Sequence, residues 1–257
     1  IRTLKAQGNS AQDWKRVWVG PKFDPKRVSR CAFLGPVFLS GCEGTVEVDG
    51  VAFPTGISHA TLSHCVVGSN VLIQNVRLVN RPVIDGHAVL FDVGTVTLEE
   101  KEETFANGLE VLIAIETGGR EVRLFAELTV DQAWVMSRSR GNRSLQEGYS
   151  SQVEAYVKAG SCPCNVIGPS ARIRHTPKVA GLFLGPSASI DSAASVEHVT
   201  VLSGSGEVSE ISRGAIVKSS ILQWGAKVTT GAIVDSSLLT EHSHVERHGK
   251  VTHSILG

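Results

Sequence analysis

The sequence has few aromatic residues, no excess of either charge and no long apolar run. Aromatic residues make up 5% of its 257 residues, and 25 Lys and Arg balance 25 Asp and Glu. A formal charge of zero gives no electrostatic reason to expect a nucleic acid or a membrane as a partner. No segment approaches the ~18 apolar residues of a membrane-spanning helix. The first ten residues, IRTLKAQGNS, lack the apolar core of a signal peptide.

Cysteine is also scarce. Five cysteines are scattered along the chain, an odd number that does not suggest a disulfide scaffold. Such usage is typical of a reducing compartment, so we expect a cytoplasmic protein. What the chain has in excess is glycine, at 26 residues, where an average protein has roughly 7%. Many glycines and few aromatics indicate short strands joined by tight turns.

Aliphatic residues recur every six positions, in triplets separated by a step of five. The first triplets are Val67, Ile73, Val79 and then Ile84, Leu90, Val96. The same spacing returns 100 residues later and again near the C-terminus, at Ile167, Ile173, Val179, Leu184, Ile190, Val196, and at Leu222, Val228, Val234, Leu239, Val245, Val251. Four positions after the aliphatic residue a small residue is usual, as at Ala171 and Ala188.

A period of six fits neither a helix nor a plain alternating strand. It favours a triangular coil of three short strands, in which each side points one aliphatic side chain inward and each corner is tight. One coil spans 17 residues, because Ile84 lies 17 positions after Val67. Stacked coils would bury the aliphatic columns and pair each strand with the coils on either side. We therefore predict an all-β fold.

The segments IGPSAR, LGPSAS, IDSAAS, VGSNVL and IDGHAV resemble the hexapeptide repeat of left-handed parallel β-helix proteins. The resemblance covers roughly residues 33–105 and 165–257. It implies a left-handed parallel β-helix and a homotrimer, since flat β-helix faces commonly associate about a three-fold axis. The fold carries acyltransferases, γ-class carbonic anhydrases and C-terminal domains of sugar nucleotidyltransferases, so it does not choose an activity.

The order of segments gives a second resemblance. AQGNSAQDW, FLGPV, GCEGTVEV, SNVLIQNV, FANGLEV and GGREV, followed by a helical insertion, resemble a bacterial family of unknown function that is often labelled nucleotidyltransferase-like. That family has no catalytic residues to carry over. The chain also lacks the Gly-rich, phosphate-cradling loop and the separate domain that nucleotidyl transfer needs.

We divide the chain into a capping segment (1–30), a first β-helix part (31–105), a hairpin and helical insertion (106–164) and a second β-helix part (165–257). In the capping segment, Asn9 or Ser10 can cap a short helix through Ala11 to Arg16. Trp14 and Trp18 are expected to cover the open first coil, because uncovered strand edges aggregate.

In the insertion, Gly118 and Gly119 mark a hairpin, and a helical pattern begins at Thr129 or Asp131 and extends to about Ala159. The polar stretch RSRGNRS (138–144) should break it into two helices. These helices contact another subunit, line a site, or pack on their own coil. The charge run EEKEE (99–103) is expected to be a solvated edge. The six-residue repeat continues into HSILG (253–257), so we expect that the chain is longer or that a second chain covers the last coil.

Nine histidines are the main candidates for chemistry, and none falls in the inward position. The resemblance to acyltransferases implies a turn histidine acting as general base at a groove between subunits. It also implies acetyl-CoA as acyl donor and a sugar or sugar nucleotide as acceptor. His87, in IDGHAV, is the first candidate for a catalytic residue and His175 the second; neither has an orienting carboxylate that the sequence identifies.

A metal enzyme is a third possibility. His59 and His64 are five apart, a spacing that γ-class carbonic anhydrases use, but His87 follows them, whereas that family's third ligand comes from an earlier coil. We therefore predict no metal site. Cys162 and Cys164 are separated by one residue, which is not the spacing of a CxxC motif, and a turn is expected there.

Three functional hypotheses remain. The first is a structural or binding module without catalysis, as part of a longer chain. The second is an acyl-CoA-dependent acyltransferase at a subunit interface. The third is a γ-carbonic-anhydrase-like metal enzyme.

Overall fold

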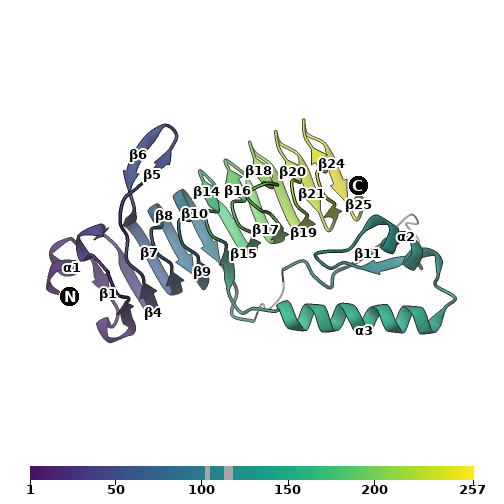
Figure 1. Cartoon of the computed structure of the whole chain (residues 1–257), viewed down its shortest axis with the longest axis horizontal. Helices are drawn as coiled ribbons and strands as arrows, with labels where there is room; N and C mark the ends of the chain where they lie inside the picture. The colour runs from purple at the N-terminus through teal and green to yellow at the C-terminus, as the bar shows by residue number, and fades with distance from the viewer. Residues whose placement is uncertain (102–104, 113–117) are drawn as a thin grey trace.

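The structure is a computed structural model that describes residues 1–101, 105–112 and 118–257. It is dominated by parallel strands that stack along one axis, with a helical insertion alongside (Figure 1). In the first part the strands are β1 (Ser10–Ala11), β2 (Val17–Val19), β3 (Val28–Ser29), β4 (Ala32–Leu39), β7 (Gly56–Val67), β8 (Leu72–Asn80), β9 (Pro82–Ile84) and β10 (Val89–Thr97).

The second part continues the same 21-stranded parallel sheet. Its strands are β13 (Asn165–Ile167), β14 (Arg172–Arg174), β15 (Lys178–Leu184), β16 (Ser189–Asp191), β17 (Ser195–Val201), β18 (Glu210–Ser212), β19 (Ile216–Leu222), β20 (Lys227–Val228), β21 (Ile233–Asp235), β22 (Leu238–Leu239), β23 (His244–Val245), β24 (Lys250–Thr252) and β25 (Ile255–Leu256). The prediction of an all-β class built on parallel strands is confirmed.

The six-residue spacing is the register of this sheet. Ile73 pairs with Leu90, Leu90 with Ile173, and Ile173 with Ile190, and all four side chains are fully buried. The 17-residue coil brings each aliphatic residue beside its equivalent in the next coil. β10 pairs directly with β14 and β15, so the second part stacks on the first across the insertion.

The corners explain much of the sequence between the aliphatic residues. Two positions after the inward residue, the backbone takes a left-handed conformation, with φ of 54° at Asp92, 48° at His175 and 54° at Ser192. Asn, Asp and His tolerate this conformation better than most residues. Many of the histidines therefore lie at corners and outside the core.

The first thirty residues join the sheet in addition to covering it. The helix expected from Ala11 to Arg16 is wrong, because Ser10 and Ala11 form β1, which pairs with β4. Pairing with β4 gives the backbone N–H and C=O groups the hydrogen bonds that a helix would otherwise have formed. What remains helical is α1 (Arg2–Ala6) and two 3₁₀ turns, Trp14–Arg16 and Pro25–Arg27.

Of the two tryptophans expected to cover the first coil, only one does so. Trp14 packs edge-on against Phe33, with ring centroids 6.1 Å apart. Trp18 points outward from β2 and is 51% exposed.

A second hairpin was not predicted. β5 (Thr45–Val48) and β6 (Val51–Pro54) pair antiparallel through the turn Asp49-Gly50, where φ is 52° and 77°. An Asp-Gly turn of this kind is a hairpin signal. Val48 is buried against Leu72 and Val89, so the hairpin packs on one outer face of the coils.

The insertion matches its prediction. β11 (Glu110–Leu112) and β12 (Glu121–Arg123) form the expected hairpin; residues 113–117 between them lie outside the described residues, as do residues 102–104 of the charge run. α2 (Val130–Arg138) begins with a capping box of Thr129 and Gln132, and α3 (Arg143–Gly160) is capped by Asn142. The polar stretch 138–144 does separate the two helices.

The insertion is fastened to the strands of residues 165–257. The Gln223 amide donates hydrogen bonds to the carbonyl oxygens of Ala126 and Leu128, both at 2.9 Å. Leu128 and Met136 share a buried apolar cluster with Ile221 and Leu238 of the coils. Among the described residues, no helix is both long and apolar enough to cross a membrane.

The inward column gives a direct test of the register. Leu184 is fully buried on β15, whereas Leu34 on β4 is 41% exposed. We expect Leu184→Ala to lower the free energy of unfolding by about 2–5 kcal/mol. Leu34→Ala, the matched control, should change it by no more than about 0.5 kcal/mol. Urea unfolding measures both, and equal losses would contradict the assigned register.

Candidate functional site

Four histidine rings have a packing role at the corners. Each lies over a glycine of the preceding coil, at a distance that leaves no room for a side chain there. A Cβ on these glycines would come within about 2.5 to 2.6 Å of a ring atom, in the pairs His64 on Gly35, His198 on Gly181, His242 on Gly225 and His248 on Gly231. Real Cβ contacts are not so short, so glycine and histidine are matched as pairs.

His87, the first catalytic candidate, lies at an exposed corner with a φ of 62°. Its backbone N–H donates to the Ser69 carbonyl oxygen at 2.9 Å. Within the described part of the chain, its ring forms no hydrogen bond and no ion pair. The structure therefore brings no carboxylate to His87 that could orient the imidazole.

His175, the second candidate, is differently placed. Its Nε2 lies 3.2 Å from Oδ2 of Asp49, and its Nδ1 lies 3.2 Å from Oδ2 of Asp92. The ring also packs edge-on against Phe91, with centroids 5.8 Å apart. The two carboxylates come from the tip of the β5–β6 hairpin and from the preceding coil, so the sequence spacing could not reveal them.

The same hairpin tip is held by arginines. Arg174 forms ion pairs with Asp49 and with Asp191, the latter at 2.6 Å between Nη2 and Oδ2. Arg172 donates a hydrogen bond to the Glu47 carbonyl oxygen at 3.2 Å. Arg172, Arg174 and His175 thus fasten one hairpin.

The charges of this cluster reinforce one another. Hydrogen bonds to Asp92 and then to Asp49 raise the pKa of His175, and the hydrogen bond from His175 lowers the pKa of Asp49. The imidazole is thereby stabilised as a cation with both nitrogens occupied. A general base needs a neutral ring with one free nitrogen facing the substrate. The geometry of His175 is that of a structural ion pair.

His59 and His64, which have the spacing of metal ligands, do not form a metal-binding cluster. His59 accepts a hydrogen bond from Arg30 at 3.0 Å, and Nδ1 of His64 lies 2.9 Å from the Ser63 hydroxyl. Throughout residues 1–101, 105–112 and 118–257, no three His, Cys, Asp or Glu side chains are arranged to hold a metal ion.

Cys162 and Cys164 lie where the chain re-enters the sheet before β13. Their Sγ atoms are 2.6 Å apart, and both thiols are free. Burial, and then the neighbouring Cys162, raise the pKa of Cys164 to about 12. A thiol that keeps its proton at neutral pH is a poor nucleophile and metal ligand.

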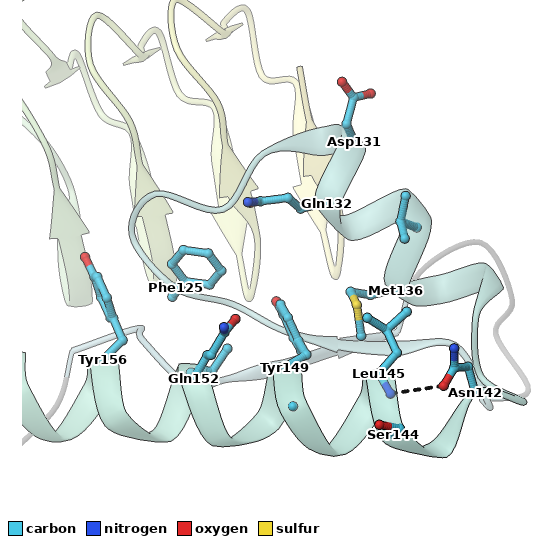
Figure 2. A pocket seen from close by; sticks show the side chains of 13 residues that line it. Phe125, Asp131, Gln132, Met136, Asn142, Ser144, Leu145, Tyr149, Gln152 and Tyr156 are labelled. Atoms are coloured by element: carbon cyan, nitrogen blue, oxygen red, sulfur yellow. Dashed lines mark hydrogen bonds between the residues drawn. The ribbon is translucent and has the colours of Figure 1, made fainter.

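A groove of about 920 Å³ opens in the insertion, between α2, α3 and the segment around Phe125 (Figure 2). Sequence analysis did not find it, because its two walls come from helices whose apolar residues are also explained by packing on the coil. Its lining residues are Phe125, Asp131, Gln132, Val135, Met136, Asn142, Ser144, Leu145, Gly148, Tyr149, Gln152, Val153 and Tyr156.

The groove is apolar with a polar rim. Val135 is 42% and Leu145 38% exposed, which is unusual for aliphatic side chains of a folded domain when they share one hollow. The Tyr149 hydroxyl donates to the Arg123 carbonyl oxygen at 2.6 Å, and burial raises the pKa of Tyr149 to about 12. Asp131 is the one charged residue among those lining the groove. The site can take an uncharged, apolar surface.

Comparison with known proteins places the chain in a family. Residues 1–256 match the model described as Domain of unknown function (DUF4954). The chain belongs to this family. It is also 24% identical, over 242 residues, to an uncharacterized protein of Treponema pallidum (strain Nichols). That match covers 89% of this chain and 33% of the relative, so the chain spans about a third of the length of that relative.

The His175 cluster predicts a pH-dependent hairpin. The raised pKa of His175 means that its contribution is complete below its ordinary value of 6.5 and is lost as the pH rises through the raised value. The lowered pKa of Asp49 means that its contribution is complete above 3.8 and is lost below that pH. We expect hydrogen-exchange protection of residues 45–54 to be greatest between these two values and to fall above pH 6.5.

The matched control is His175→Gln, which keeps a polar side chain but cannot be charged. Its hairpin should be less protected than the wild type at pH 6, and its protection should not change up to pH 8. The same decline in both proteins would show that His175 does not control the hairpin.

Proposed function

We propose that the chain is a left-handed parallel β-helix of the hexapeptide-repeat type that acts as a non-catalytic binding module. The groove of the insertion is its binding surface. The observation that carries the proposal is the exposure of several apolar side chains in one hollow between α2 and α3. On folded proteins, large exposed apolar patches commonly mark interaction sites.

The repeat supports the fold assignment. Parallel pairing joins equivalent residues 17 positions apart, as between Ile173 and Ile190, and left-handed backbone recurs at the corners. A triangular coil with one inward aliphatic residue on each side accounts for both. The stack is a rigid support, and it carries the insertion on one of its faces.

The histidines support a role without catalysis. His175 has both nitrogens bound to carboxylates, and His87 has no orienting partner in the described residues. Four of the other histidines pack on glycines. An acyltransferase of this fold would instead hold one neutral, oriented imidazole at its acceptor site.

The chemistry of the groove defines what it binds. Aromatic and aliphatic side chains line most of it, together with the amides of Gln132, Asn142 and Gln152; Gln152 stands between Tyr149 and Tyr156 (Figure 2). Such a surface gains free energy by removing apolar area from water, while the amides orient the bound group. We infer that the bound group is an apolar patch of a protein.

An apolar fluorescent dye such as bis-ANS tests the groove. At sub-micromolar protein concentration we expect saturable binding of one dye per chain. Leu145→Asp should weaken that binding at least tenfold, because it places a charge in the apolar floor. Val51→Asp, a change at a 55% exposed position on β6, is the control and should bind as the wild type does. Equal binding by the two variants would contradict the proposal.

Acetyl-CoA tests the enzymatic alternative directly. Calorimetric titration should give no saturable heat at millimolar acetyl-CoA, alone or with a sugar nucleotide. Binding of one acetyl-CoA per chain that is lost in His87→Ala would overturn the non-catalytic role and favour an acyltransferase.

A further inference from the structure

One outer face of the coils carries a row of residues that are apolar at every position except Thr200. Each residue of the row directly precedes an inward aliphatic residue on the side of the coil that contains Val67, Ile84, Ile167 and Leu184. Neighbours in the row are paired across adjacent strands. We call it the apolar ladder. In order, it contains Trp18, Phe38, Val66, Val83, Val166, Phe183, Thr200, Ile221, Leu238 and Ile255.

The C-terminal half of the ladder is covered by the chain itself. Ile221 and Leu238 are fully buried, in one cluster with Leu128 and Met136 of the insertion. Further along the ladder, Phe183 packs against Phe105, with ring centroids 6.3 Å apart. The chain thus shows what fits this face, namely the apolar side of the insertion.

The N-terminal half of the ladder is not covered. Trp18 is 51% and Val66 45% exposed, and Phe38 and Val83 are half-buried. The insertion cannot reach them in its own chain, because α2 lies beside the C-terminal coils and β2 and β4 lie at the opposite end of the stack (Figure 1). Aromatic and aliphatic residues in a continuous row on an exposed sheet face require a partner more than isolated ones do.

The N-terminal segment is basic, whereas the one charged side chain that lines the groove is acidic. Residues 1–30 contain eight Lys and Arg but two Asp, in a chain whose net charge is zero. Lys15, Arg16 and Lys22, close to Trp18 in sequence, form no ion pair within the described residues. In the insertion, Asp131 lines the groove and Glu127 is close enough to raise the pKa of Tyr156; neither carboxylate is ion-paired in the part that the structure describes.

We propose that the partner is a second copy of this chain, whose N-terminal half of the apolar ladder docks in the insertion groove. This rests on the proposed function, in which the groove is the binding surface. The apolar surfaces meet, and the basic N-terminal coils approach Asp131 of the groove. The two patches are different, so the contact is heterologous and each chain has one groove to offer and one ladder to be bound. A closed head-to-tail ring of chains would occupy every groove and every ladder.

Two single variants that each remove one side of the contact provide the test. Trp18→Asp disrupts the ladder and Leu145→Asp disrupts the groove; both positions are exposed, so the fold should be unchanged by circular dichroism. By sedimentation velocity we expect the wild type to associate at micromolar concentration. Each variant alone should associate at least tenfold more weakly, because each puts a charge into an apolar interface.

Mixing the two variants distinguishes this contact from other modes of association. The Trp18→Asp chain keeps an intact groove, and the Leu145→Asp chain keeps an intact ladder. An equimolar mixture should therefore form a one-to-one heterodimer at concentrations where each variant alone stays monomeric. Failure of the mixture to associate would overturn a heterologous contact. Val51→Asp, which lies outside both surfaces, should associate as the wild type does, and added salt should weaken association.

The dye assay separates this proposal from the proposed function. A wild type that stays monomeric at high concentration, with a groove that still binds dye, would overturn the second-copy partner and leave the binding module standing. A monomer whose groove binds no dye would overturn both. If both proposals are correct, the Trp18→Asp chain should bind dye at concentrations where the wild type has its groove covered.

Discussion

The structure depends on one constraint, that each side of every coil must bury one aliphatic side chain while its backbone pairs with the coils before and after. Ile73, Leu90, Ile173 and Ile190 show it in four successive coils. Apolar burial supplies the driving force, and the parallel ladder leaves few backbone groups unpaired. The other positions of the repeat do not have to be aliphatic, so the residues found there report on turns, surface contacts and binding.

Most of the histidines that were candidates for catalysis lie at corners of the coils, where they have a structural role. A left-handed backbone is best tolerated by glycine and by Asn, Asp and His, so a histidine at a corner needs no chemical role to explain it. The close packing of rings on glycines adds a second structural reason. His175 has a third, because Asp49 and Asp92 hold it as a cation. A candidate base chosen from sequence alone in this fold is therefore weak evidence.

The parts of the fold that sequence predicted are those that depend on local or periodic signals. The register follows from single aliphatic residues at a fixed spacing, and the insertion helices follow from their apolar periodicity and the polar stretch between them. The helix through Ala11 to Arg16 failed because pairing with β4 outweighed a local cap. The β5–β6 hairpin was missed although Asp49-Gly50 signals it. The His175 cluster depends on Asp49, 126 positions away, and no local pattern encodes that contact.

The three outer faces of the coils differ, and this difference separates scaffold from surface. On one face Arg174 pairs with Asp191, and on another Glu197 pairs with Lys178 and Lys218, which hold its pKa at about 2. Charged rows of this kind keep a sheet face in water. The third face is apolar from Trp18 to Ile255, with Thr200 as its polar member. A sheet that is apolar on both its inner and outer sides must be covered, and the insertion covers it only over the C-terminal coils. The N-terminal coils therefore also need an apolar cover on this face, of the kind that the insertion provides for the C-terminal coils.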